Sequence, residues 1–520
     1  EMRERLHLAL SQAADAGNPR AKGQLLLLGK ASISTLHSFC LQLVRRHAYL
    51  VDIDPRFRVL DPEEAGLLKV EAMDELFESL HQDPEEYAPL LEHYAGKRDD
   101  RELRALVLAL FEYVESLPDP EAWLDRAARS YDPREPESAS AFQRWREALL
   151  AEARAEVERA LFSLARAIDI ARLPAGPEEY LESFQTTLGS LQHARDLLAQ
   201  GGWDEAALAL ASVDFPRLPA RGGSDPVLRE EARKARDAAK EIVNDLNKGL
   251  FGRSLASYHE DLSRLEPVVT GLCRLVRAYG QRYQRRKDEA GGVDFADLER
   301  LALKALTHSS GRALAECRRR FVEVLVDEYQ DINPVQDRLI TLVSRREEGA
   351  GNRFLVGDVK QSIYRFRLAD PRIFQEKHRT FADPADPLSV RIDLQANFRS
   401  RPEILEAVNF LFRQIMYPET AEIDYDEAAE LRPGREEPGE PLEPACVEVH
   451  LIERLREKEP GAGEGDLETA SLAAVEREAA VVGRLIRRLV HEGVDGRDGR
   501  YSYRDIAVLM RSPKGKVNRL

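Results

Sequence analysis

The stretch FVEVLVDEYQDINPVQD, residues 321–337, joins an apolar run to a group of acids. Its β-branched and leucine residues predict a buried strand: Val322, Val324, Leu325 and Val326. Asp327 and Glu328 follow this strand directly, and Asp331 lies about one turn further on. Acids at the carboxyl end of such a strand lie where open α/β sheets bind their ligands.

One chemistry fits this acid pair: Asp327 would hold Mg²⁺ on a nucleotide and Glu328 would orient the attacking water. That chemistry also needs a phosphate-binding loop. The nearest match to GxxxxGK[ST] is GQLLLLGKAS at 23–32, in which the two glycines are six apart and Ala31 replaces the hydroxyl residue. We reject this match. Either the acids have a different role, or the loop is encoded before residue 1.

The bulk composition limits the class of protein. A chain of 520 residues predicts two to four domains, and it has no apolar stretch of the ~18 residues that a membrane span needs. The cysteines form no CxxC pair, so we expect no zinc and no disulfide framework, and a reducing cytoplasm. The net charge of −16 argues against a protein that coats nucleic acid, but allows a narrow basic groove.

Residues 1–60 mix a helix in EMRERLHLAL, a possible strand in QLLLLGK and an amphipathic helix after a strand-to-helix change at STLHSFC. Residues 61–290 have almost continuous helical periodicity. Breaks are expected at SLPDPEAW, YDPREPES, LPAGPEEY, DFPRLPARGGSDP and NKGLFGRS. An apolar seam from Leu255 to Tyr283, with a kink at Pro267, predicts helix packing within the domain or an intermolecular coiled coil.

Strand character returns at 291–400, where strands separated by helices predict a parallel α/β sheet. RFLVGDVKQSIYRF and SVRIDLQANFRS continue this pattern. Beyond it we expect helices at 403–416 and 467–491 and strands in CVEVHLI and RDIAVLMRS. A polar linker is expected at 429–444, and a loop in EKEPGAGEGD.

GDVKQSIYRFR, residues 357–367, combines an amide with interleaved aromatic and basic residues. Gln361 lies near a strand end, where it could sense a γ-phosphate. Tyr364 and Phe366 alternate with arginines, a pattern that can grip single-stranded nucleic acid because bases stack on the rings for about 1–3 kcal/mol each. The segment could equally be an ordinary half-buried one.

Two further motifs place polar groups at helix starts. In NFRSRPEIL, Arg399 could reach from a second domain to neutralise transition-state charge, and Phe398 could pack on an adenine. In STLHSFC, Thr35, His37 and the serine suit phosphate and sugar contacts. A surface arginine and a structural histidine are the alternatives.

The motifs STLHSFC, VDFADL, LVDEYQD, VGDVKQSIYRFR, LQANFRS and YRDIAVLMRS, in this order, resemble superfamily 1 DNA helicases of the UvrD/PcrA/RecB type. The form VGDVKQSIYRFRLADP, with the long insertion before VDFADL, is most similar to the AddA-type family. The resemblance implies two incomplete RecA-like P-loop NTPase motor domains. The first would comprise residues 1–60 and 291–385, interrupted by a helical insertion at 61–290, and the second residues 386–520.

The resemblance also implies roles for single residues. Asp327 would bind Mg²⁺, Glu328 would activate water, and Gln361 would couple the γ-phosphate of ATP to DNA. Arg399 would be the arginine finger of the second motor domain, beside Phe398. The residues expected to contact single-stranded DNA are Thr35, His37, Phe39, Tyr364, Phe366 and Arg367. This sequence departs from the family pattern at Leu368, which is often glycine, and at Phe398, which is often tyrosine.

The implied activity is an ATP- and Mg²⁺-dependent 3′-to-5′ DNA helicase acting in double-strand-break repair and recombination. The implied partners are single-stranded and duplex DNA and an AddB-type subunit. EMRERL looks like the tail of a motif that follows the phosphate loop, and neither the last helicase motifs nor a nuclease motif appear by residue 520. We therefore expect a chain truncated at both ends, which alone hydrolyses ATP negligibly.

Two alternatives stay open at this stage. One is a solo UvrD/PcrA-type repair helicase without a nuclease. The other is a helicase-derived scaffold that binds DNA or a partner without hydrolysis. The basic cluster RYQRRK, residues 282–287, could touch duplex DNA or form a solvated helix end.

Overall fold

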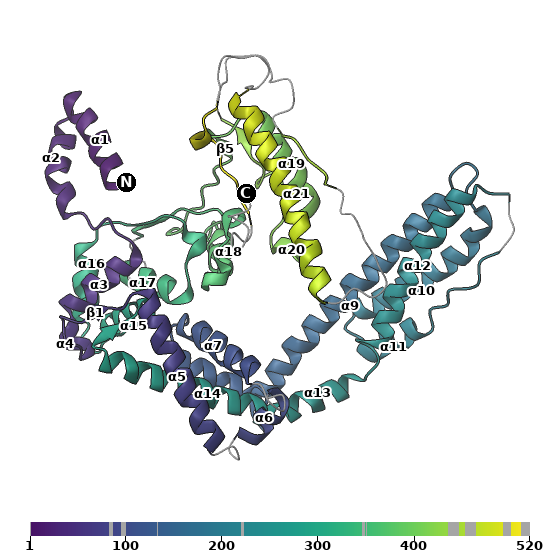
Figure 1. Cartoon of the computed structure of the whole chain (residues 1–520), viewed down its shortest axis with the longest axis horizontal. Helices are drawn as coiled ribbons and strands as arrows, with labels where there is room; N and C mark the ends of the chain where they lie inside the picture. Colours follow the sequence, from purple (N-terminus) through teal and green to yellow (C-terminus); the bar gives the residue numbers. More distant parts are fainter. Residues whose placement is uncertain are drawn as a thin grey trace. The chain divides into compact units, whose positions relative to one another are not determined.

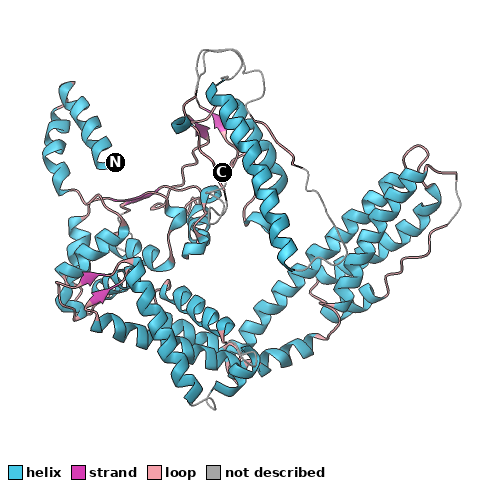
Figure 2. Ribbon diagram, viewed as in Figure 1, coloured by secondary structure: helices cyan, strands magenta, loops and turns pink. Residues whose placement is uncertain are grey.

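The computed structural model describes residues 2–82, 87–94, 100–132, 134–219, 223–345, 349, 351–434, 447–452, 464–491 and 501–510. Contacts divide the chain into two compact units, residues 1–390 and 391–520, and each is described by itself. Helices dominate both units, and the strands are short and paired in parallel (Figure 2). The fold is thus mostly helical with small parallel sheets, whereas the sequence favoured larger parallel sheets.

The first unit opens with a pair of helices that pack on each other. The elements up to residue 59 are α1 (Met2–Asp15), α2 (Pro19–Leu27), η1 (Leu28–Lys30), α3 (Leu36–Arg46), α4 (Ala48–Val51) and β1 (Arg58–Val59). The strand predicted in QLLLLGK is wrong, because this run ends α2 and forms η1. The Asn18 side chain caps α2 by accepting from the backbone N–H groups of residues 20 and 21, and leucines are strong helix formers. The strand expected before α3 is absent from residues 31–35 as well.

A series of helices fills the range 62–289, as its periodicity predicts. They are α5 (Pro62–Gln82), α6 (Ala88–Tyr94), α7 (Arg101–Glu115), α8 (Pro120–Arg129), α9 (Pro136–Ala171), η3 (Glu178–Tyr180), α10 (Leu181–Ala199), α11 (Trp203–Ala211), α12 (Pro226–Lys248), α13 (Leu255–Arg264) and α14 (Glu266–Glu289). Each predicted break contains a junction between two of these helices. Proline at the first turn explains several of the restarts, because its missing N–H is not needed there.

Two separate apolar clusters hold these helices together. In one, α9, α10 and α12 run side by side around residues such as Leu164, Leu191 and Val243 (Figure 1). In the other, α14 packs on α5, α6, α7 and α8. The predicted seam is divided between them: its carboxyl half, including Tyr279 and Tyr283, belongs to the second cluster, and Leu255 and Tyr258 belong to the first. Pro267 lies in the first turn of α14, so the chain breaks there instead of kinking.

The elements that follow are β2 (Gly292–Val293), α15 (Phe295–Leu306), α16 (Arg312–Arg320), β3 (Val324–Val326), η4 (Tyr329–Asp331), α17 (Pro334–Val343), β4 (Arg353–Leu355), η6 (Val359–Gln361), η7 (Arg365–Arg367) and α18 (Pro371–Thr380). β1 pairs with β2 and β3 pairs with β4, both in parallel. Helices α3, α15, α16 and α17 share one core cluster. A parallel strand pair with a helix between its strands is what the sequence predicted for this region.

The strand β3 is not buried as predicted. Val324 and Val326 pack against the cluster that contains Ile340 of α17. Leu325, however, is 71% exposed, and its neighbour Phe354 on β4 is 57% exposed. Within the described residues this sheet has only β3 and β4, and no helix covers its second face. A strand whose side chains are apolar on both faces is fully buried only when other elements of the protein cover both faces of its sheet.

The second unit contains β5 (Ala396–Asn397), α19 (Pro402–Ile415), α20 (Pro418–Ala421), β6 (Arg432–Pro433), α21 (Glu464–His491) and η8 (Tyr503–Asp505). The two helices predicted here, at 403–416 and 467–491, are confirmed. Of the strands predicted, only β5 forms, pairing with β6; residues 389–395, 447–452 and 506–510 lie outside any strand. Residues 435–444 of the predicted linker and 457–463 of the predicted loop lie outside the described residues. In the described parts both predictions are wrong, because β6 lies within the linker and residues 464–466 begin α21. Short apolar runs form strands only where a neighbouring strand completes the hydrogen bonds.

No described helix is long and apolar enough to span a membrane. Cys40, Cys273 and Cys317 are buried free thiols, and burial raises the pKa of each, that of Cys317 to about 11. These thiols therefore behave as small apolar side chains.

Candidate functional site

The ends of β3 and β4 lie next to each other, and the predicted acids follow the first of them. The backbone N–H of Val356 donates to the carbonyl of Val326 at 2.9 Å, and the N–H of Tyr329 donates to the carbonyl of Val356 at 2.9 Å. Asp327 and Glu328 therefore begin a loop at the same sheet edge as the loop 357–361. This is the edge at which the sequence predicted a ligand site.

Glu328 adopts a left-handed backbone conformation with φ of 52°. Such a conformation is costly for a residue with a Cβ atom and is common at functional sites. Its N–H donates to Oδ1 of Asp327 at 3.0 Å, which fixes the aspartate over the turn. Both carboxylates are exposed at the strand end, so both are accessible to a ligand.

Gln330 connects the two loops. It is almost fully buried, its Nε2 donates to Oε2 of Glu328 at 2.7 Å, and its Oε1 accepts the N–H of Asp358 at 3.1 Å. Gly357 leaves the room for this contact, since a Cβ atom there would lie 2.6 Å from Oε1 of Gln330. The orientation of the Glu328 carboxylate is thus tied to the loop after β4.

Asp331 gives this edge an excess of negative charge. Burial, and then repulsion from Glu328, raise the pKa of the Asp331 carboxyl, and its buried Oδ1 has no hydrogen-bond partner in the described structure. No group of three His, Cys, Asp or Glu side chains in the described residues is arranged to hold a metal. Mg²⁺ on a nucleotide needs only one or two carboxylates, the rest of its shell being phosphate and water. Asp327 beside this negative charge fits such a cation.

Gln361 lies in η6 on the loop after β4, at the edge that carries the acids. Its Nε2 donates to Oδ2 of Asp358 at 2.9 Å, and Lys360 pairs with the other oxygen of the same carboxylate at 3.0 Å. Asp358 in turn donates its N–H to Gln330. The predicted sensor and the predicted water-activating acid are therefore linked through Asp358 and Gln330.

Tyr364, Phe366 and Arg367 form one cluster, in which Tyr364 is half buried and the other two side chains are exposed. The two ring centroids are 6.0 Å apart, and the guanidinium of Arg367 lies 5.0 Å from the centroid of Tyr364 and 5.4 Å from that of Phe366. Phe366 is 76% exposed, although it is apolar. Leu368 follows with φ of 66°, the conformation that explains why glycine is frequent at this position. The cluster offers flat apolar faces and a cation together.

Thr35, His37 and Phe39 begin α3. Thr35 caps this helix by accepting the N–H of Ser38 at 3.3 Å. His37 is half exposed, and its ring meets the ring of Phe295 edge-on at 5.1 Å. Phe39 is half buried and packs edge-on against Phe321 at 5.9 Å, so its ring offers less surface than that of Phe366.

Phe398 and Arg399 belong to the second unit. The side chain of Asn397 accepts the N–H groups of Arg399 and Ser400 at 3.0 and 2.9 Å, which holds the turn between β5 and α19. Phe398 is 69% exposed and lies against Gly434 after β6, where a Cβ atom would come within 2.7 Å of its ring. Both predicted side chains therefore belong to one turn that the side chain of Asn397 caps.

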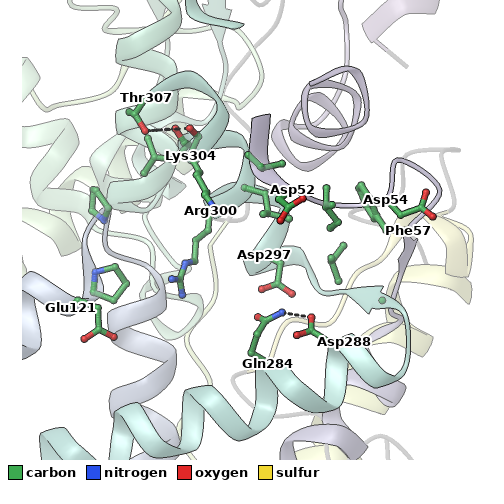
Figure 3. Close-up of a pocket in the computed structure, with 18 of the residues that line it drawn as sticks. Asp52, Asp54, Phe57, Glu121, Gln284, Asp288, Asp297, Arg300, Lys304 and Thr307 are labelled. Carbon is green, nitrogen blue, oxygen red and sulfur yellow. Dashed lines mark hydrogen bonds between the residues drawn. The ribbon is translucent and has the colours of Figure 1, made fainter. Parts of the chain in front are cut away.

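A cavity of about 930 Å³ in the first unit lies apart from these residues. Figure 3 shows Arg300 and Asp297 from α15 and Gln284 from α14 reaching toward it. Its lining mixes acids and bases, and none of the residues predicted for nucleotide or DNA binding contributes to it.

The basic cluster 282–287 is largely neutralised within the first unit. Arg285 and Arg286 pair with Glu75 of α5, and Lys287 is buried against Asp297. A solvated helix end is therefore wrong for Lys287, and the pairing leaves little free charge for duplex DNA.

Two residues at the site were missed by the sequence analysis. Gln330 lies inside DEYQD, and the burial of its amide cannot be inferred from the spacing of this motif. Glu299 is a buried acid on the apolar face of α15. It accepts hydrogen bonds from Asn333 and Gln336 and lies 3.0 Å from Nε2 of His37. An acid on the apolar face of a predicted helix was the available signal for it.

Comparison with known proteins gives a consistent result. The family model of the UvrD/REP helicase N-terminal domain matches residues 1–198 and 229–382. Three curated relatives, each named as one subunit of an ATP-dependent helicase/nuclease, are similar to this chain. The protein of Alkaliphilus oremlandii is 40% identical over 98% of this chain and 42% of its own length, and that of Bacillus licheniformis likewise 40% over 98% and 42%. The protein of Desulforamulus reducens is 38% identical over 100% of this chain and 44% of its own length. The chain thus spans less than half the length of these relatives.

Proposed function

Because the chain belongs to the UvrD/REP helicase family, we propose that it carries the ATP-hydrolysing and DNA-gripping residues of an ATP-driven DNA helicase. The observation that carries this proposal is the edge formed by β3 and β4. There Glu328, in a strained backbone conformation, is connected through Gln330 to the loop that bears Gln361. A water-activating acid and a phosphate sensor need this kind of rigid connection.

In this proposal Asp327 holds the cation and Glu328 orients water toward a phosphoryl group. Mg²⁺ bound to ATP would supply neutralisation of the charge on the transferred phosphoryl group. Glu328 accepts the amide proton of Gln330 through one oxygen, which leaves its second oxygen for the water. Arg399 and Phe398, on the second unit, would contribute a cation to the transition state and a ring to the adenine.

The aromatic cluster is proposed to hold single-stranded DNA. Bases can stack on Tyr364 and Phe366, and Arg367 can meet a phosphate. Thr35 and His37 would add contacts at the start of α3. Gln361 and Tyr364 lie three residues apart on the segment after β4, so a change in the nucleotide site can reach the DNA contact within one short stretch.

The names of the relatives support a narrower proposal. Each is named as one subunit of an ATP-dependent helicase/nuclease, which implies a second subunit, for which an AddB-type protein is our proposal. The same names imply a nuclease activity that the motifs of this chain do not supply. Movement in the 3′-to-5′ direction and a role in double-strand-break repair and recombination rest on the same resemblance.

The substitution Glu328→Gln tests the proposal in protein expressed from the complete gene. We expect the rate of DNA-stimulated ATP hydrolysis to fall about 100-fold or more, since that is the usual contribution of a general base, while nucleotide binding is retained. Glu323→Gln, an exposed acid on the same segment, is the matched control and should hydrolyse ATP at the normal rate. Unchanged hydrolysis by Glu328→Gln would refute the role proposed for Glu328, whereas absence of hydrolysis and unwinding in the unchanged protein would favour a scaffold that only binds DNA.

A further inference from the structure

Glu299 of α15 joins the candidate DNA contact to the helix that follows the acid loop. Only 5% of the residue is exposed. Its Oε1 accepts from Nε2 of Gln336 at 2.6 Å and lies 3.0 Å from Nε2 of His37, and its Oε2 accepts from Nδ2 of Asn333 at 3.1 Å. We propose that Glu299 is a positioning residue that transmits DNA binding at His37 to the nucleotide-facing acids; this rests on the proposed function.

The amide orientations at this site are fixed by a capping box. Asn333 accepts the N–H of Gln336 through Oδ1 at 2.8 Å, and Gln336 accepts the N–H of Asn333 through Oε1 at 3.2 Å. Each side-chain oxygen is thereby occupied, so each NH₂ group must face Glu299. The carboxylate is thus held by two neutral donors from the start of α17.

The third group at this carboxylate is His37, whose Nε2 lies 3.0 Å from Oε1 of Glu299. The ring of His37 is half exposed, so it stays accessible to a ligand while it contacts the buried carboxylate. Within the described residues, the groups that contact the Glu299 carboxylate are two amides and an imidazole, so the position of this buried side chain depends on all three contacts. A phosphate that draws the ring of His37 toward itself would weaken one of the three.

The other end of this network lies close in the sequence to the acids Asp327, Glu328 and Asp331. Asn333 lies two residues after Asp331, and the carbonyl of Ile332 between them accepts the N–H of Asp370 at 2.9 Å. Leu36, next to His37, packs with Tyr329 and Ile332 in the cluster under the loop. A displacement of His37 can therefore shift residues 327–333, both through its contact with Glu299 and through the packing of the adjacent Leu36. His37 and Glu328 need not touch for DNA to alter the position of Glu328.

The test uses Glu299→Gln in protein expressed from the complete gene, with its partner subunit if one copurifies. The amide keeps the shape but points an NH₂ group at a donor. The measured quantity is the ratio of ATP hydrolysis at saturating oligothymidine to hydrolysis without DNA. We expect this ratio to fall about fivefold or more, the usual lower size of coupling between sites. The double variant with His37→Gln should be no worse than the poorer single variant, because both remove one connection.

Glu316→Gln is the matched control, since Glu316 of α16 pairs with His47 of α3 at 3.4 Å, outside this network. It should leave the ratio unchanged even if it lowers the melting temperature. If Glu299→Gln does not fold, Gln336→Met removes one donor and should lower the ratio in the same direction. If the folded variants show a normal ratio, this inference is refuted but the proposed function is not. Absence of DNA stimulation in the unchanged protein would overturn the proposed function and the inference with it.

Discussion

Gln330 donates a hydrogen bond of 2.7 Å to the carboxylate of Glu328, two residues before it in the chain. The same amide accepts the N–H of Asp358 at 3.1 Å. A single buried side chain therefore joins the loops that follow β3 and β4. Glu328 depends on it for orientation, because its own backbone is in the strained left-handed region.

The substitution Gln330→Met keeps the length of this side chain and removes its hydrogen bonds to Glu328, Asp331 and the N–H of Asp358. We expect the free energy of unfolding to fall by about 1–3 kcal/mol, because the N–H of Asp358 would lose its acceptor. DNA-stimulated ATP hydrolysis should fall by more than the fraction of protein that unfolds. Urea denaturation and hydrolysis rates on the same preparation measure the two effects.

Gln143→Met is the control for Gln330→Met. Gln143 also donates to a glutamate, Glu147 at 2.9 Å, but on the exposed face of α9. It should change neither stability nor hydrolysis measurably. Equal rates for Gln330→Met and the unchanged protein would mean that Glu328 keeps its orientation without the bridge.

Helices were predicted well from the sequence because their signals are local. Pro136 and Pro226 stand in the first turns of α9 and α12, and the apolar residues between breaks recur at helical spacing. The strands were predicted poorly, because an apolar run such as 389–395 does not reveal whether a partner strand is present. Leu325 illustrates the same limit, since its burial depends on a second covering layer.

The site was predictable only in part, for a similar reason. Asp327, Glu328 and Gln361 follow strand ends, which is a local pattern. Glu299 and Gln330 act through partners more than 25 residues away, His37 and Asp358 among them, and no spacing encodes such contacts. The positive φ of Leu368 could be anticipated, because the family often has glycine at this position.

Asp331 should make the stability of the chain depend on pH. Burial and Glu328 raise the pKa of its carboxyl in the folded state, so the folded form favours the protonated acid. Its stabilising contribution is complete below the ordinary carboxyl pKa of about 3.9 and is lost as the pH rises through the raised value. Asp331→Asn should therefore raise the free energy of unfolding at pH 7 and change it little below pH ~4.

Urea denaturation of both proteins across this pH range measures the difference. Asp54→Asn is a useful contrast, since the backbone N–H and the guanidinium of Arg56 lower the pKa of Asp54. That substitution should destabilise the chain slightly at pH 7 and have no effect at low pH. A stability difference for Asp331→Asn that does not vary with pH would contradict the assignment.

Substitution of Lys287, near the end of α14, should lower the free energy of unfolding more than substitution of any other charged residue in the helical region. It is 2% exposed, and its Nζ lies 2.6 Å from Asp297 and 3.6 Å from Asp294. Burial alone would raise the pKa of Asp294, but Lys287, the N–H of Asp297 and the hydroxyl of Tyr283 hold it below its ordinary value. Removing the lysine would leave the carboxylates of Asp294 and the buried Asp297 without their shared cation.

We therefore expect Lys287→Met to lower the free energy of unfolding by about 3–5 kcal/mol at pH 7, the usual result of breaking a buried ion pair. Asp294 and Asp297 form the capping box of α15, the helix that carries Glu299, so the loss should extend to the candidate site. Lys304→Met, on the exposed face of the same helix, should cost little. Urea denaturation at pH 7 compares the two variants, and a loss below about 1 kcal/mol for Lys287→Met would mean that water reaches and solvates these carboxylates.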